Sequence, residues 1–204
     1  MKVKICGVKN IHAVKGAVDA GADFIGLMFA ESKRRISIDQ AKKLATYIPP
    51  HVKKVGVFVN PNLRDVLEAV HTVGIDAVQL HGDESPAFCS EIPIPVIKAF
   101  HMNGKEDIEK AGHYRTDYYL FDSPGGRYRG GSGMTFDWEL LQDVDIPREK
   151  VILAGGLRPD NIQEAIHEVK PAMVDVSSGV ETNGEKDAEK IQRFIEKAKK
   201  EELV

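Results

Sequence analysis

Short apolar runs rich in valine, isoleucine and phenylalanine alternate along the chain with segments in which apolar residues recur every three or four positions. Such runs fit the pleated surface of a β-strand, and the longer spacing fits one face of a helix. The runs begin near Val3, Phe24, Lys54, Ala77, Val96, Tyr118, Val151 and Met173, mostly about 20 to 30 residues apart. Because each interval has room for one crossover helix, the pattern predicts βαβ units and a parallel sheet.

The intervals carry helix start and stop signals. Ser37 is placed to cap one helix, and Gly21 and Gly74 lie just past the ends of two others. We expect helices near residues 11–18, 37–48, 63–73, 87–92, 107–111, 138–141, 162–169 and 187–199. Eight such units indicate a single (β/α)8 TIM barrel domain over residues 1–204, near the lower size limit of that fold. The alternative is a doubly wound open sheet, which usually has fewer units and a phosphate loop after its first strand.

One connection, Ser123–Thr135, is long and unusually rich in glycine. It follows the sixth apolar run, where a helix would otherwise begin. A segment of this composition is either a mobile lid or a poorly ordered loop, and we favour a lid.

The composition is ordinary for a soluble globular protein, with 42% hydrophobic and 29% charged residues. A net charge of −3 gives no indication of nucleic-acid binding, and no apolar run reaches the roughly 18 residues needed to span a membrane. The cysteines, Cys6 and Cys89, are too few for a disulfide framework, and the histidines are too scattered to predict a metal site. No nicotinamide fingerprint is present. We therefore expect a cytoplasmic protein that binds neither nucleic acid nor membrane.

Polar residues stand where the predicted strands end, which is where the chemistry of a (β/α)8 barrel is located. They are Cys6, Arg34, Asn60, His81, Lys98, Asp122, Gly155-Gly156 and Ser177-Ser178-Gly179. Cys6 follows a short strand and precedes a glycine. A free cysteine is often simply a small buried apolar residue, so a functional role for Cys6 has to be supported by the residues around it.

Two of these loops predict a phosphate site. Gly155 and Gly156 follow strand seven, and Ser177 and Ser178 follow strand eight, so backbone N–H groups and hydroxyls from adjacent loops can converge on one anion. Each motif alone is also consistent with a simple turn. Their occurrence after the last two strands favours a phosphorylated ligand.

Three further residues have both a functional and a structural interpretation. Asp122 ends an apolar run, so burial would keep it protonated, although an aspartate there can also cap a helix. Arg34 can clamp a carboxylate with two hydrogen bonds or belong to a solvated charged loop. His81 is either a ligand contact or a hydrogen-bonded loop histidine.

The motifs together resemble the phosphoribosylanthranilate isomerase family over essentially the whole chain. They are Lys4-Ile5-Cys6-Gly7, Gln79-Leu80-His81-Gly82, Phe121-Asp122, Gly130-Gly131-Ser132-Gly133 before Phe136-Asp137-Trp138, Ala154-Gly155-Gly156-Leu157, and Asp175-Val176-Ser177-Ser178-Gly179-Val180-Glu181. The resemblance implies an enzyme of tryptophan biosynthesis that converts N-(5-phosphoribosyl)anthranilate to its 1-deoxyribulose isomer by an Amadori rearrangement.

The resemblance also implies roles for individual residues. Cys6 would be the general base and Asp122 the general acid. Arg34, or its neighbour Arg35, would hold the anthranilate carboxylate, with His81 beside the substrate and Asp175 near the site. One acid and one base suffice for this reaction, so no cofactor is expected.

These roles reverse the ordinary protonation of a thiol and a carboxyl. We therefore expect burial to raise the pKa of Asp122, and helix N-termini or a cation to lower the pKa of Cys6. The expected partner is a small phosphosugar, and the chain would act as a monomer or a homodimer. Two alternatives are another sugar-phosphate isomerase or decarboxylase that uses Lys98, and a non-catalytic phosphosugar-binding subunit.

Overall fold

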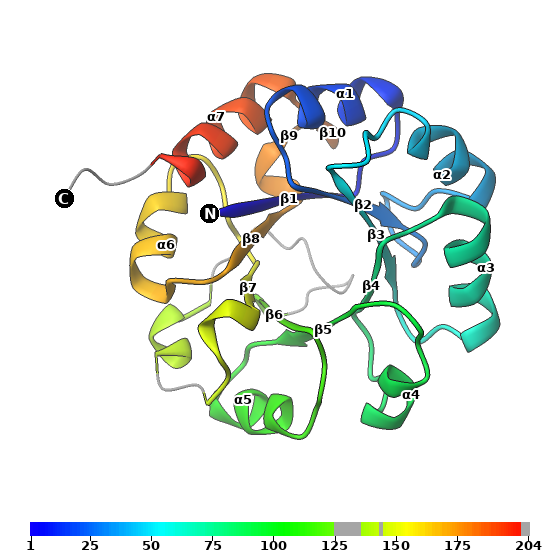
Figure 1. The fold of residues 1–204 in the computed structure, drawn as a ribbon. Coiled ribbons are helices and arrows are strands. Elements are labelled where there is room, and N and C mark those ends of the chain that lie inside the picture. The colour runs from blue at the N-terminus through cyan, green and yellow to red at the C-terminus, as the bar shows by residue number, and fades with distance from the viewer. Residues whose placement is uncertain (125–135, 143–144, 201–204) are drawn as a thin grey trace.

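The protein is described by a computed structural model that covers residues 1–124, 136–142 and 145–200. Its main sheet contains β1 (Lys2–Cys6), β2 (Phe24–Met28), β3 (Lys53–Phe58), β4 (Ala77–Leu80), β5 (Val96–His101), β6 (Tyr118–Asp122), β7 (Val151–Leu153) and β8 (Met173–Val176). These eight strands pair in chain order, all parallel, and β1 pairs with β8 to close a barrel (Figure 1). The predicted barrel is confirmed, and the open-sheet alternative is wrong.

A ring of helices surrounds the barrel (Figure 1). The α-helices are α1 (Ile11–Asp19), α2 (Ile38–Ala45), α3 (Leu63–Val73), α4 (Pro86–Ser90), α5 (Lys105–Gly112), α6 (Ile162–Val169) and α7 (Ala188–Lys199). The short helix expected in the sixth connection is the 3-10 helix η1 (Trp138–Leu141), and a second 3-10 helix, η2 (Arg148–Lys150), precedes β7. None of the described helices has the length and apolar character needed to cross a membrane.

Local capping explains several of the helix bounds. Ser37 and Gln40 form a reciprocal capping box at the start of α2, and the side chains of Asn10 and Asn62 accept hydrogen bonds from the first turns of α1 and α3. Helix α2 ends at Ala45, so the predicted extension to Ile48 is wrong. That stretch forms turns before Pro49-Pro50.

Alternation along each strand separates two apolar cores. A small cluster fills the barrel interior with Val55, Ala77, Ile97, Ala99, Leu120, Ile152, Ala154 and Met173. A larger cluster lies between the strands and the helices and includes Val3, Ile5, Val78, Phe121 and Val174. Because side chains alternate between faces, Asp122 faces inward with Leu120, as does Asp175 with Met173.

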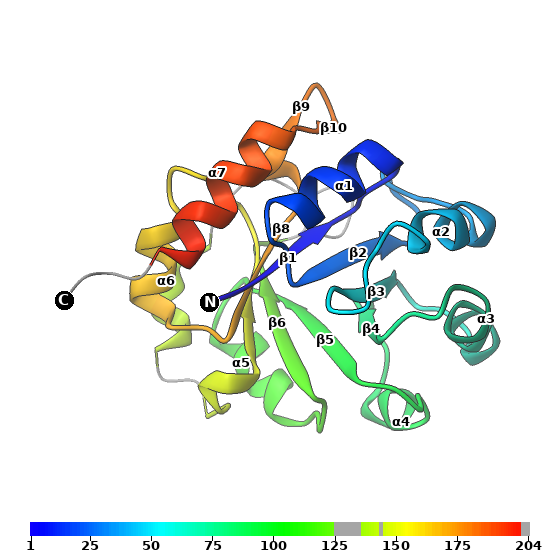
Figure 2. The ribbon, with the colours of Figure 1, turned by 45° about the horizontal axis from the view of Figure 1, so that its top comes forward.

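The segment after β8 folds back toward the barrel. It forms the 3-10 helix η3 (Ser178–Val180) and a hairpin of β9 (Glu181–Thr182) and β10 (Glu185–Lys186). Figures 1 and 2 show this hairpin beside the ends of α1 and α7. Its position places residues distant in sequence next to the end of β1.

Candidate active site

The carboxyl ends of the strands bring most of the predicted site residues to one mouth of the barrel. Cys6 ends β1 and Asp122 ends β6, with β8 and β7 between them around the barrel. Both side chains are buried. The thiol and the carboxyl therefore lie on different sides of the same opening.

Cys6 lies among charged groups that its sequence neighbours alone do not reveal. Lys4, fully buried and two residues earlier on the same face, is 3.0 Å from Asp175 of β8. Burial raises the pKa of the Cys6 thiol, and the positive charges of Lys4 and Lys186 offset this only in part. The prediction of a lowered Cys6 pKa is wrong. The predicted cations are present, but desolvation outweighs them.

Asp122 lies beside His81, whose Nε2 atom is 3.3 Å from Oδ2 of the carboxylate. The backbone N–H of Ser123 donates to Oδ1 at 2.8 Å. Burial raises the pKa of Asp122, but its contact with His81, the charge of His101 and the Ser123 N–H together lower that pKa below its ordinary value. The prediction that burial raises the pKa of Asp122 and keeps it protonated is therefore wrong.

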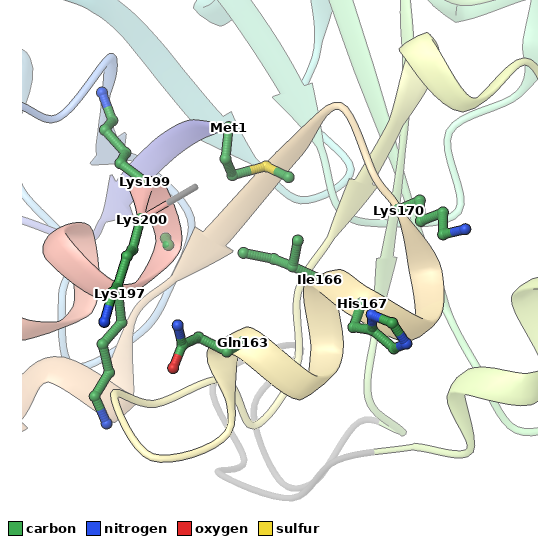
Figure 3. Close-up of a pocket in the computed structure, with 9 residues that line it drawn as sticks. Met1, Gln163, Ile166, His167, Lys170, Lys197, Lys199 and Lys200 are labelled. Carbon is green, nitrogen blue, oxygen red and sulfur yellow. The ribbon is translucent and has the colours of Figure 1, made fainter. Parts of the chain in front are cut away.

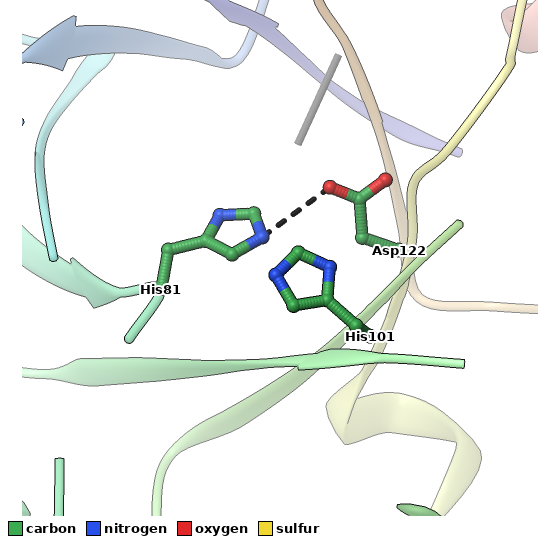
Figure 4. A group of neighbouring side chains, drawn as sticks. All are labelled: His81, His101 and Asp122. Carbon is green, nitrogen blue, oxygen red and sulfur yellow. Dashed lines mark ion pairs between the residues drawn. The ribbon is translucent and has the colours of Figure 1, made fainter. Parts of the chain in front are cut away.

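His101 is a further residue of this group that the sequence analysis missed. It ends β5 and pairs in register with Asp122, and its ring lies 5.0 Å from that of His81 between centroids. Figure 4 shows the three side chains directed toward one another. Its position along the strand could have indicated it, because His101 is two residues beyond Ala99, whose side chain points into the barrel.

Arg34 lies at the mouth close to β1. Its side chain packs over Gly7, whose φ of +75° and lack of a Cβ leave space for the guanidinium stem. Nε and Nη2 donate to the two oxygens of Glu181 at 2.7 and 2.8 Å, and this contact raises the pKa of Arg34. Arg35, by contrast, is exposed and lines a hollow with Ser37 and Asn62.

The two predicted phosphate loops are neighbours because β7 and β8 pair. Gly155 has φ of +81°, and a Cβ there would collide with the backbone nitrogen of Ser123. The Asn161 amide donates to the Gly156 carbonyl at 3.1 Å and so fixes this loop. Ser178 opens η3, while the Ser177 hydroxyl donates to the Cys6 carbonyl at 3.1 Å.

Lys186, from the β9–β10 hairpin, links the Ser177 loop to Glu181. The sequence did not indicate this residue. Its ammonium group donates to the Ser177 carbonyl at 2.9 Å and lies 2.6 Å from Glu181. Glu181 in turn binds Arg34. Spacing along the chain gave no signal for this network, because a loop and a hairpin assemble it in space.

Two other residues singled out at strand ends have structural partners. Lys98 lies between inward-facing Ile97 and Ala99, so it faces the helix layer. There it pairs with Glu84 at 3.1 Å. Asn60 accepts a hydrogen bond from the Asp83 N–H at 2.7 Å and braces a loop. The glycine-rich lid falls almost entirely on residues 125–135, outside the described residues.

A hollow also lies at the opposite end of the barrel (Figure 3). It is lined by Met1, Gln163, Ile166, His167, Lys170, Lys197, Ala198, Lys199 and Lys200. Met1 precedes β1 and Lys170 precedes β8, while the other lining residues lie along α6 or at the end of α7. None of the predicted site residues lies there.

Comparison with known proteins gives one consistent result. The family model described as "PRAI: N-(5'phosphoribosyl)anthranilate (PRA) isomerase" matches residues 3–197. An N-(5'-phosphoribosyl)anthranilate isomerase from Bacillus mycoides is 52% identical over 200 residues, covering 98% of both chains.

Solved structures agree with the family match. The phosphoribosyl anthranilate isomerase from Thermotoga maritima is 41% identical, with a TM-score of 0.90 and 98% of both chains covered. A structure of such an isomerase in complex with reduced 1-(o-carboxyphenylamino)-1-deoxyribulose 5-phosphate is 39% identical, with a TM-score of 0.87 and the same coverage.

Proposed function

This chain belongs to the N-(5'-phosphoribosyl)anthranilate isomerase family of tryptophan biosynthesis, and we propose that it performs the family's reaction with Cys6 as general base and Asp122 as general acid. The observation that carries these roles is the burial of one thiol and one carboxyl at the ends of β1 and β6, around a single barrel mouth. Adjacent glycine and serine loops on β7 and β8 provide the place for a phosphate.

The reaction converts an aminoaldose into an aminoketose. Asp122 gives a proton to the ring oxygen as the bond from that oxygen to C1 breaks, and a Schiff base forms between C1 and nitrogen. The Cys6 thiolate then removes the proton on C2, and the resulting enolamine tautomerises to the ketone. The atoms balance without an added reagent, so an acid and a base account for the chemistry.

The pKa shifts favour the opposite protonation states, because a raised pKa favours the Cys6 thiol and a lowered pKa favours the Asp122 carboxylate. At its ordinary pKa, about 3% of a cysteine is thiolate at pH 7, and burial reduces this fraction further. Substrate carries negative charge into the mouth, which favours the protonated form of Asp122. Lys4 and Lys186 favour the thiolate. We infer that substrate binding and these two lysines establish the reactive combination.

The remaining predicted residues are assigned to substrate binding. The phosphate would contact the backbone of Gly155 and Gly156 and the Ser177–Ser178 loop, and this remote binding energy positions the sugar. Arg34 uses Nε and one Nη2 hydrogen for Glu181, so its other edge keeps donors for an aryl carboxylate. We assign this contact to Arg34 because Arg35 faces a different hollow.

We propose that His81 and Asp175 act on the reaction through the two catalytic residues. His81 contacts Asp122 and would orient that carboxyl against the substrate. Asp175 pairs with Lys4, so it would act on Cys6 through that lysine. The Lys98 side chain faces the helix layer and pairs with Glu84, which disfavours an isomerase or decarboxylase that uses Lys98.

We further propose that the protein acts in the cytoplasm as a monomer or a homodimer. The isomerase from Thermotoga maritima is described as dimeric, which supports the second state for this chain. Sedimentation of the purified protein over a concentration series would separate the two.

The direct test uses the fluorescence of the anthranilate group. Purified protein without added metal should reduce the fluorescence of phosphoribosylanthranilate as the Amadori product forms. A regulatory phosphosugar-binding subunit would bind this compound and leave the fluorescence to decay at the uncatalysed rate. That second outcome would contradict the proposed activity.

A further inference from the structure

Three strands deliver nitrogen and oxygen donors to one point in the barrel mouth. His81 follows β4, His101 ends β5 and Asp122 ends β6. One ligand atom from each lies within 4.8 Å of the other two, and His81 and Asp122 are buried. Two imidazoles and one carboxylate are a donor set that zinc uses in proteins.

The measured spacing is close to what a metal ion requires. Bonds of about 2.1 Å in a tetrahedral site place ligand atoms about 3.4 Å apart. The His81 Nε2 to Asp122 Oδ2 distance is already 3.3 Å. The remaining separations are at most 4.8 Å, so a small rotation of the partly exposed His101 would bring its nitrogen into range.

Each imidazole also has a partner for its other ring nitrogen. His101 Nδ1 lies 3.3 Å from the Ser123 carbonyl oxygen, which accepts a hydrogen bond when that nitrogen is protonated. This tautomer presents Nε2 as the metal ligand. Histidine ligands in metal sites commonly donate their second N–H to a carbonyl in this way.

Gln79 supplies the equivalent partner for His81. Its Nε2 is 3.1 Å from His81 Nδ1, and its buried Oε1 has no hydrogen-bond partner among the described residues. Turning the amide by 180° places Oε1 against a protonated Nδ1 at the same distance. His81 Nε2 then carries a lone pair directed toward Asp122. The amide can therefore support either tautomer of His81.

We propose that His81, His101 and Asp122 form a binding site for a divalent transition-metal ion of the zinc class, with the fourth position open to the barrel mouth. Magnesium and calcium prefer oxygen ligands and fit this set poorly. The ion takes no part in the isomerisation. By binding the Asp122 carboxylate it blocks proton donation, a consequence that rests on the proposed role of Asp122.

Binding is tested with cobalt as a spectroscopic substitute for zinc. Metal-free protein without an affinity tag is titrated with Co²⁺, and the visible d–d bands of a four-coordinate site are expected. His101→Asn should weaken the affinity by at least about 100-fold, because losing a ligand costs more than losing its outer partner. Gln79→Leu should weaken it by about 10- to 100-fold.

The matched control is His113→Gln, which removes an exposed histidine just past α5 and should leave the titration unchanged. Circular dichroism checks that each variant is folded. Equal affinity in the wild type, His101→Asn and Gln79→Leu would overturn the proposal. So would a thiolate charge-transfer band, because it would place the metal at a cysteine.

A measurement of isomerase activity distinguishes failure of the metal site from failure of the proposed function. Zn²⁺ should inhibit the wild type, and a chelator should restore the rate. His101→Asn should resist the same zinc concentration. If cobalt binding depends on His101 but leaves the isomerase rate unchanged, the metal site is supported. The proposed role of Asp122 as general acid is then contradicted.

Discussion

At the scale of single residues, burial and neighbouring charge compete at Cys6 and Asp122 with opposite results. At Cys6 desolvation exceeds the attraction of two lysines, and the thiol pKa is raised. At Asp122 the contacts with His81, His101 and the Ser123 N–H exceed desolvation, and the carboxyl pKa is lowered. The sequence predicted which two residues matter but not these balances, because the balances depend on long-range contacts.

Asp122→Asn tests the acid directly. The amide keeps the size of the carboxyl but has no acidic proton, so we expect kcat to fall by about 100- to 10,000-fold. Binding of a non-reactive phosphosugar analogue, measured by calorimetry, should stay within a few-fold of the wild type. If the variant retains a tenth of the normal kcat, Asp122 is not the general acid.

The raised pKa of Cys6 predicts the pH dependence of its alkylation. Only the thiolate reacts, so the rate with iodoacetamide should be low at pH 7 and rise until the pH exceeds the pKa of the folded protein. Mass spectrometry after digestion assigns the label to Cys6. Alkylation of Cys89 should be slow, since burial raises its pKa to about 11.

Lys186→Met should move this alkylation profile to higher pH, because it removes a positive charge that favours the Cys6 thiolate. Glu181 keeps Arg34 as a partner in this variant. Lys9→Met is the control, since Lys9 pairs with Glu185 of the same hairpin at the surface. Identical profiles for Lys186→Met and the wild type would contradict the role assigned to Lys186.

At the scale of elements, the positions of all eight strands could be predicted from their apolar runs and spacing. Their ends then indicated Cys6, His81 and Asp122. The residues missed were His101, Glu181 and Lys186. His101 required knowledge of which strand face points inward. The other two lie on a hairpin with no apolar pattern, and only its return to the barrel brings them to the site.

The loop after β7 gives a prediction for the phosphate. Gly156 has φ of +63°, and Gly156→Asp adds both a side chain and a negative charge where the phosphate would bind. Repulsion of several kcal/mol should raise the Kd of a phosphosugar analogue by about 100-fold or more. Gly74→Asp, at φ of +68° after α3, carries the same backbone strain away from the mouth and should bind normally. Equal affinities in the two variants would remove the phosphate assignment.

The loop after β2 gives a prediction for the aryl carboxylate. Arg34→Met should cost about 2 to 5 kcal/mol of substrate binding if the contact is a desolvated ion pair. A substrate analogue without the carboxylate should bind this variant and the wild type alike. Arg35→Met is the matched comparison, and a loss confined to Arg35→Met would show that the neighbouring arginine holds the carboxylate.

At the scale of the whole molecule, the barrel is closed where the first and last strands meet. Lys4 of β1 and Asp175 of β8 form a buried ion pair across this seam. Burial lowers the pKa of Lys4, but Asp175 and Cys6 raise it more, so it lies above its ordinary value. The stabilisation from this group is therefore fully present below its unfolded pKa and is lost as pH rises through the folded value.

Asp175→Asn tests whether this seam holds the barrel together. It leaves the buried Lys4 ammonium without its ionic partner, so the free energy of unfolding should fall by about 3 to 5 kcal/mol in urea at pH 7. Because the chain is expected to be a single domain, fluorescence and circular dichroism should report one coincident transition. The double variant Lys4→Met/Asp175→Leu removes both charges and should recover most of the loss. Two separate transitions in the wild type would contradict the single domain, and an unchanged Asp175→Asn midpoint would show that closure does not depend on the pair.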